Sequence, residues 1–368
     1  MTTVIPEIQA LRFIAAGMVL FGHLQHERLI VSASIGVPAK PFEPLFWGAG
    51  VDIFFIISGF VMTYGAKDRF GRPGAARVFM LQRLLRVAPF YWAWTTAMLL
   101  ATTIWPERID HPQFSWSQVA GSFLFLPVAD PYGSYYPLLR LGWTLNFEML
   151  FYSLFAIGLL FRRRAGLASI AVALLLLGGL PYLATPKNSL LAFWAHPILL
   201  EFLLGMASAQ LQLGGVRLGS ATAWSLAAAG IVLLIAVRAA GLSEVSGLTR
   251  PLLVGLPALL ICAPALVAPG GPAPGPLMRM LMFGGDMSFA LYLSHPFSIA
   301  LAAMVLPSLG LGNAWVAVAS VGISALAAGA LAYLCFERPV SIWLAAALDR
   351  ASAPLTTEAG LGQQRGRG

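Results

Sequence analysis

The sequence predicts an all-α, polytopic transmembrane helix bundle of about ten spans. Hydrophobic residues make up 58 % of the 368 residues and charged residues only 10 %, whereas a soluble domain carries about 25 % charged residues. Mean hydropathy is +0.79, and apolar runs recur at the length that crosses a bilayer as a helix. Backbone groups in lipid must be paired internally, and these runs lack the alternation of barrel strands, so we expect helices.

Windows of about twenty residues place the predicted spans in order along the chain. They are 8–25, 45–65, 84–104, 141–161, 166–183, 191–212, 221–240, 249–268, 285–306 and 312–335. A shorter apolar piece, 119–127, is expected to be interfacial or re-entrant. We expect one membrane domain over residues 1–345. Residues 346–368 are polar and glycine-rich and are expected to form a disordered cytoplasmic tail.

The basic residues predict the orientation of the bundle. With ten spans, sixteen of the 23 lysines and arginines fall on one side and seven on the other. Basic residues collect on the cytoplasmic side, so both termini are expected in the cytoplasm. The same residues explain the net charge of +8, and we therefore expect contact with membrane lipid and no nucleic-acid partner.

The stretch from Ile8 to Leu24 carries an arginine near its start and a histidine near its end. Arg12 and His23 are eleven residues apart, which is about three helical turns or roughly 16 Å of rise. Both side chains therefore project from nearly the same face. Ionisable residues in a lipid-spanning helix are costly, so the pair suggests a path through the bundle. The alternative is that Arg12 reaches the headgroups and His23 caps the far end of the span.

Two carboxylates are predicted at the depth of His23, toward the outer leaflet. Asp52 lies at the start of the second span in GVDIFFIISGF, and Glu148 at the start of the fourth in GWTLNFE. Each would be costly alone, so we expect the three groups to pair. A carboxylate beside a histidine fixes its tautomer and stabilises the imidazolium, as general-base catalysis requires. A purely structural hydrogen-bond cluster is the alternative.

Arg83 and Arg86 are predicted to join Arg12 at the inner end of the bundle. They are three residues apart in QRLLRVAPFYW, hence neighbours on a helix. Arginine forks bind phosphate well. The alternative is an ordinary cluster of positive charge at the cytoplasmic face.

Other polar groups are weaker signals of function. Glu201 lies deep within the sixth span, where a carboxylate is expensive. For Asp286, Tyr292 and His295 we expect a structural role, because Pro296 interrupts the helix ladder beside them. The sequence has no phosphate-binding P-loop, GxSxG or HExxH motif, and its histidines lack metal-ligand spacing. We therefore expect no metal site.

With these residues in order, the chain resembles the acyltransferase 3 family of integral membrane O-acyltransferases. The sequence of residues 137–149 is most similar to that of bacterial exopolysaccharide O-acetyltransferases of the succinoglycan type. The matching pieces are IQALRFIAAGMVLFGH at 8–23, GVDIFFIISGF at 50–60, RLLRVAPFYW at 83–92, GWTLNFEMLFY at 142–152, EFLLGM at 201–206, GDMSFALYLSHP at 285–296 and FERP at 336–339.

The resemblance implies transfer of an acyl group, commonly acetyl, from a cytoplasmic coenzyme A thioester to a sugar hydroxyl. The acceptor would be an exopolysaccharide or a lipid-linked saccharide at the bacterial inner membrane, and polysaccharide-synthesis proteins are possible partners. Arg12, Arg83 and Arg86 would hold the donor, and His23 would act as general base, oriented by Asp52 or Glu148. This reaction requires a continuous channel from the arginines to His23.

Two rival functions fit the same residues. A transporter or flippase of polyprenyl-linked sugars would also use polar groups at two depths and a broken helix such as the one at Pro296. A scaffold for polysaccharide synthesis would need no acyl donor. The sequence does not distinguish direct transfer from an acyl-histidine intermediate, and it identifies neither the glycan nor its hydroxyl.

Overall fold

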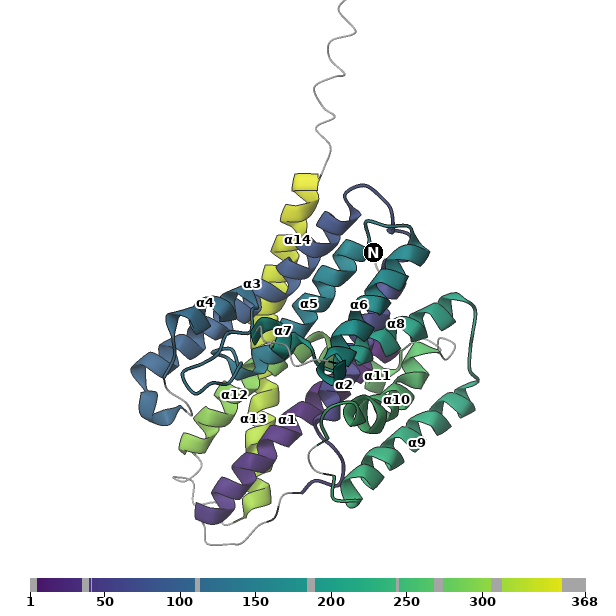
Figure 1. Ribbon diagram of the computed structural model, residues 1–368. Helices are drawn as coiled ribbons and strands as arrows, with labels where there is room; N and C mark the ends of the chain where they lie inside the picture. The colour runs from purple at the N-terminus through teal and green to yellow at the C-terminus, as the bar shows by residue number, and fades with distance from the viewer. Residues whose placement is uncertain are drawn as a thin grey trace, which may run out of the picture.

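The fold is a bundle of helices in which segments far apart in the sequence pack side by side (Figure 1). The computed structural model describes residues 5–34, 40, 42–109, 113–183, 189–242, 245–267, 274–305 and 313–352. Within these ranges helices are the only regular secondary structure, so the all-α prediction is confirmed.

The α-helices follow one another along the whole chain, with short 3₁₀ or π turns at 106–108, 140–142, 251–255 and 333–337. They are α1 (Pro6–Ser34), α2 (Ala49–Gly65), α3 (Ala75–Ile104), α4 (Trp116–Leu124), α5 (Trp143–Gly158), α6 (Arg163–Leu183), α7 (Ser189–Trp194), α8 (Leu199–Leu213), α9 (Ser220–Ala239), α10 (Leu256–Leu266), α11 (Pro276–Asp286), α12 (Ser288–Val305), α13 (Ala314–Ala332) and α14 (Arg338–Ser352). The end of α14 lies toward the upper end of Figure 1, and the C-terminal end of α1 lies at the lower end.

A helix lies at each of the ten predicted spans, but not every one has the length and composition of a full crossing. In the described part of the chain, four helical segments are long and apolar enough to cross a membrane: Pro6–Gln25, Arg163–Leu183, Ser220–Ala239 and Trp315–Leu348. Four shorter apolar helices accompany them in the same described ranges. These segments support a membrane bundle, while the ten crossings and the cytoplasmic termini stay predictions.

Two predicted boundaries differ from the structure. The span predicted at 191–212 is broken into α7 and α8, because Pro197 has no N–H for the helix ladder. There Nδ1 of His196 accepts the N–H of Ile198 at 3.1 Å. The last span does not end at 335 but continues through a π turn into α14, which ends at Ser352. The predicted domain end at residue 345 therefore falls within α14, and residues 353–368 lie outside the described part of the chain.

Glycines let α2 and α8 approach until their backbones touch. A Cβ at Gly59 would collide with the carbonyl of Phe202, and one at Gly205 would collide with the carbonyl of Ile56. Small residues allow this close packing between apolar helices, where lipid supplies little hydrophobic drive. The contact fixes α2, which carries Asp52, against α8, which carries Glu201.

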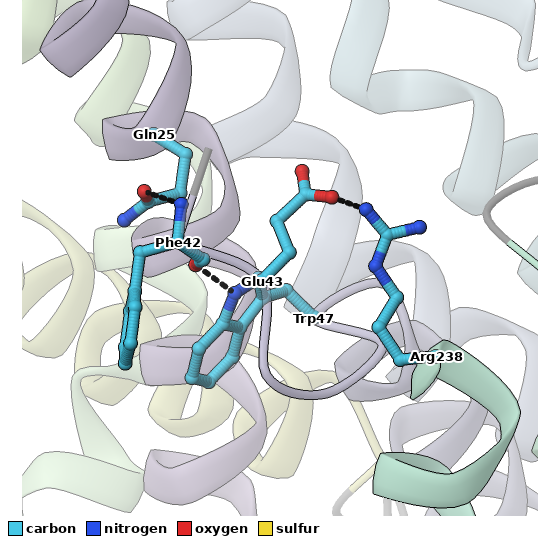
Figure 2. Close-up of polar contacts among 5 residues, drawn as sticks. All are labelled: Gln25, Phe42, Glu43, Trp47 and Arg238. Carbon is cyan, nitrogen blue, oxygen red and sulfur yellow. Dashed lines mark hydrogen bonds and ion pairs between the residues drawn. The ribbon is translucent and has the colours of Figure 1, made fainter. Parts of the chain in front are cut away.

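Residues 42–47, just before α2, are held at the lower end of the bundle by the polar contacts drawn in Figure 2. The backbone N–H of Phe42 donates to Oε1 of Gln25 at 2.9 Å, and Nε1 of Trp47 donates to the carbonyl of Phe42 at 3.2 Å. Glu43 forms an ion pair with Arg238 of α9. The segment thus connects the C-terminal half of α1 with α9 and sets where α2 begins.

The helix contact predicts unequal effects for two glycines of α2. Gly59→Ala is expected to lower the free energy of unfolding by about 1–3 kcal/mol because the new methyl group meets a backbone carbonyl. Gly65→Ala is the matched control, since a Cβ there meets nothing within 4 Å. Denaturant unfolding in detergent measures both. Equal behaviour of the two variants would contradict the packing described.

Candidate active site

A cavity of about 560 Å³ lies between α1, α2, α3, α5 and α12. Its volume is in the range of small-molecule sites, roughly 300–1,000 Å³. The polar side chains that line it include Gln9, Arg12, Lys67, Arg69, Arg83, Arg86, Thr144, Glu148, Tyr152, Ser288 and Tyr292. The structure therefore brings the three predicted arginines together in one site, although they come from two helices far apart in the sequence.

Arg12 is held in the cavity wall by a chain of two hydrogen bonds. Its Nη1 donates to Oε1 of Gln9 at 3.1 Å, and Nε2 of Gln9 donates to Oδ1 of Asp286 at 2.6 Å. Gly285 permits this arrangement, because a Cβ there would collide with the backbone of Gln9. The sequence analysis missed Gln9. Gln9 lies three residues before Arg12 on the same helix face, and this spacing could have predicted the contact between the two side chains.

Arg83 contributes a cation with a nitrogen that has no partner. Its guanidinium lies 5.9 Å from the ring centre of Phe79, and among the described residues its buried Nε has no hydrogen-bond partner. Buried donors are normally satisfied. A planar group of five N–H donors facing a cavity suits an anionic ligand such as a phosphate.

Glu148 does not join His23, as the sequence suggested, but lines the cavity with the arginines. It accepts a hydrogen bond from the hydroxyl of Tyr152, one turn further along α5. The prediction was wrong because depth in the bilayer does not specify which way a helix faces. The carboxylate instead adds a negative charge to the cationic end of the cavity.

Asp52 is paired with Arg250, so its predicted pairing with His23 is wrong. Nη2 of Arg250 lies 2.7 Å from Oδ2 of Asp52, whose side chain is 0 % exposed. Among the described residues Oδ1 of Asp52 has no hydrogen-bond partner, and neither has either carboxylate oxygen of Glu201. Arg250 directly precedes the π turn at 251–255, and only packing brings it against α2.

The described partner of His23 is a second histidine, His295 of α12. Nε2 of His295 lies 3.2 Å from Nδ1 of His23, and the ring centres are 4.9 Å apart. Nδ1 of His23 also lies 2.9 Å from the carbonyl oxygen of Val19. His23 is exposed, while His295 is 1 % exposed. The expectation of a purely structural role for His295 missed this contact, which no spacing within the sequence reveals.

The expected continuous channel from the cavity to His23 stays a prediction. His23 and His295 are not among the described residues that line the cavity, whereas Tyr292 is. The Tyr292 hydroxyl lies 2.9 Å from Oγ1 of Thr144 and donates to the carbonyl of Leu141 at 3.0 Å. The Tyr292 ring centre is 6.2 Å from that of His295. Tyr292 therefore lies next to both the cavity and His295.

Comparison with known proteins identifies the family to which this chain belongs. A family model described as an acyltransferase domain matches residues 5–334, so the chain belongs to the acyltransferase 3 family, whose members are membrane proteins. The chain is thus an acyltransferase. No group of three or more histidines, cysteines or carboxylates suited to a metal was found among the described residues.

Two bacterial relatives illustrate the family. The chain is 33 % identical over 300 residues to the exopolysaccharide production protein ExoZ of Rhizobium meliloti, which covers 79 % of this chain and 89 % of that protein. It is 28 % identical over 197 residues to nodulation protein 10 of Rhizobium leguminosarum bv. viciae, covering 45 % of this chain and 48 % of that protein. No solved structure matches the chain.

The ion pair predicts that Asp52 acts on stability and not on His23. Asp52→Asn is expected to lower the free energy of unfolding by about 3–5 kcal/mol, because it leaves a buried guanidinium without its partner. Asp68→Asn is the control, because it makes the same change at an exposed carboxylate in the loop after α2. Denaturant unfolding in detergent measures the difference. A fully stable but inactive Asp52→Asn variant would argue for a catalytic role instead.

Proposed function

We propose that the protein moves an acyl group, acetyl in the simplest case, from cytoplasmic acyl-CoA to a hydroxyl of an exopolysaccharide or lipid-linked sugar. The observation that carries the proposal is the placement of Arg12 and His23 on α1. Arg12 lines the cavity, and His23 lies eleven residues further along the same helix, where it contacts His295. The intervening rise of roughly 16 Å suits a long, thin donor that reaches from one site to the other.

The cationic end of the cavity would hold the nucleotide phosphates of the donor. Arg12, Arg83 and Arg86 supply the charge, and Gln9 keeps Arg12 in place. Glu148 would limit the excess of positive charge and keep the arginine side chains apart. The apolar walls from α2 and α12, which include Phe54, Phe55 and Phe289, suit the pantetheine arm.

His23 would act as general base for direct transfer. Its Nε2 takes the proton of the sugar hydroxyl while that oxygen forms a bond to the thioester carbonyl carbon. The carbon–sulfur bond then breaks, and the sulfur leaves as a thiolate that recovers the proton from His23.

The acceptor is inferred from the printed name of the relative that matches most of the chain, which refers to exopolysaccharide production. A bacterial inner-membrane location with ten crossings and cytoplasmic termini would bring the arginine cavity to cytoplasmic donor and His23 toward the outer sugar. Polysaccharide-synthesis proteins would then be neighbours that deliver the acceptor. The rival function, a sugar flippase, requires no acyl donor.

Removal of the base is expected to abolish transfer while donor binding survives. Purified His23→Ala protein should release free CoA from acetyl-CoA with a sugar acceptor at least about 100-fold more slowly than wild type, and should bind acetyl-CoA as tightly. Thiol release and equilibrium dialysis measure the two quantities. Wild-type release by His23→Ala would dispose of the base role, and no release by the wild-type protein with any glycan would favour the flippase.

Removal of a cavity arginine is expected to weaken donor binding. Arg12→Gln or Arg86→Gln should raise the KM for acetyl-CoA about 10-fold, because one charge-assisted hydrogen bond is worth about 1.5–3 kcal/mol. Arg77→Gln is the matched control: Arg77 belongs to the same helix as Arg86 but is exposed and does not line the cavity. Unchanged KM values in the cavity variants would count against the donor site.

A further inference from the structure

We propose that His295 positions His23, by accepting its Nδ1 proton and so presenting the Nε2 lone pair to the acceptor hydroxyl. This inference rests on the proposed function for its catalytic meaning, but the proton arrangement can be tested without any catalysis. His295 thus takes the role that the sequence had assigned to Asp52.

Contacts of the two rings with helix carbonyls determine where the protons lie. Nδ1 of His295 is 3.1 Å from the carbonyl oxygen of Leu291. A carbonyl can only accept, so this nitrogen carries the proton of a neutral His295 ring. Its Nε2 is then an acceptor, and this is the atom that faces His23.

The same reasoning applied to His23 gives a consistent result. Its Nδ1 faces two acceptors, the carbonyl oxygen of Val19 at 2.9 Å and Nε2 of His295 at 3.2 Å. A proton on Nδ1 can be shared by these two acceptors, whereas a lone pair on Nδ1 would repel the lone pairs of the Val19 carbonyl oxygen. The reversed arrangement, with His295 donating to His23, would set lone pairs against both carbonyls. Only one arrangement of protons satisfies all three contacts, and it leaves the basic lone pair of His23 on Nε2.

The fold makes His295 a rigid support. Its side chain is 1 % exposed, so water does not compete for Nε2. Ser288, Tyr292 and His295 recur at the spacing of one face of α12, and that face runs from the cavity to His23. When His23 takes the acceptor proton on Nε2, the Nδ1–H bond to His295 becomes charge-assisted and therefore stronger. The pair thus stabilises the state in which the hydroxyl has lost its proton.

A variant series at residue 295 tests the role of the acceptor. His295→Phe keeps an aromatic ring but removes the acceptor, and is expected to lower kcat by about 10- to 100-fold with the KM for acetyl-CoA unchanged. His295→Gln can return an amide oxygen to the place of Nε2 and is expected to recover most of that loss. His295→Asn, whose amide reaches only to the place of Nδ1, is the matched control and should behave like His295→Phe. Detergent unfolding midpoints check that all three variants fold.

Two kinetic results would overturn the proposal. One is wild-type kcat in a folded His295→Phe variant. The other is an equal loss in His295→Gln and His295→Phe, because the ring would then serve packing and not hydrogen bonding. A loss that appears in the KM for acetyl-CoA would likewise assign His295 to the donor site.

Nitrogen-15 NMR of histidine-labelled wild-type protein in nanodiscs tests the proton arrangement directly, with His23→Ala and His295→Gln used for assignment. Both neutral rings are expected to carry their proton on Nδ1. A proton on Nε2 of His295 would overturn the inference whatever the activity. If the NMR result holds but His23→Ala remains fully active, the proposed base role fails and the positioning contact survives as a structural one.

Discussion

The organising constraint is the fixed rise of α1, which places Arg12 and His23 about 16 Å apart along the helix axis and on one face. Each side chain is oriented by its own helix: Arg12 by the side chain of Gln9, and His23 by the carbonyl of Val19. The axial separation of the two residues is therefore a property of one helix, and the surrounding helices supply the partners.

The structure keeps its buried ion pair away from the histidines. Asp52 and Arg250 neutralise one another between α2 and the π turn before α10, where glycines clamp α2 against α8. Burying a charge is costly unless it is paired. A neutral imidazole beside His23 avoids that cost in the resting state, because a buried carboxylate there would need a cation of its own. The ion pair therefore contributes to helix packing, while the proposed proton transfer is assigned to the separate pair of histidines.

Helix α12 joins the two halves of the proposed site. Tyr292 lines the cavity and bonds Thr144 and Leu141, and His295 contacts His23 three residues later. The same helix thus borders both the cavity and the histidine pair. A donor that displaces the Tyr292 hydroxyl would act on the same helix that carries His295, which couples occupancy of the cavity to the surroundings of the histidine pair.

The sequence by itself determined the helical class, because apolar runs in lipid leave the backbone no other way to pair. It also determined the spacing of Arg12 and His23, since both lie on one helix. The family could be recognised from the sequence for a similar reason, because its motifs are short continuous stretches of the chain. Tertiary structure alone decided the partners across helices, because the rotation of each helix about its axis depends on packing. That is why Asp52 pairs with Arg250, Glu148 lies with the arginines, and His295, separated from His23 by 272 positions, contacts it.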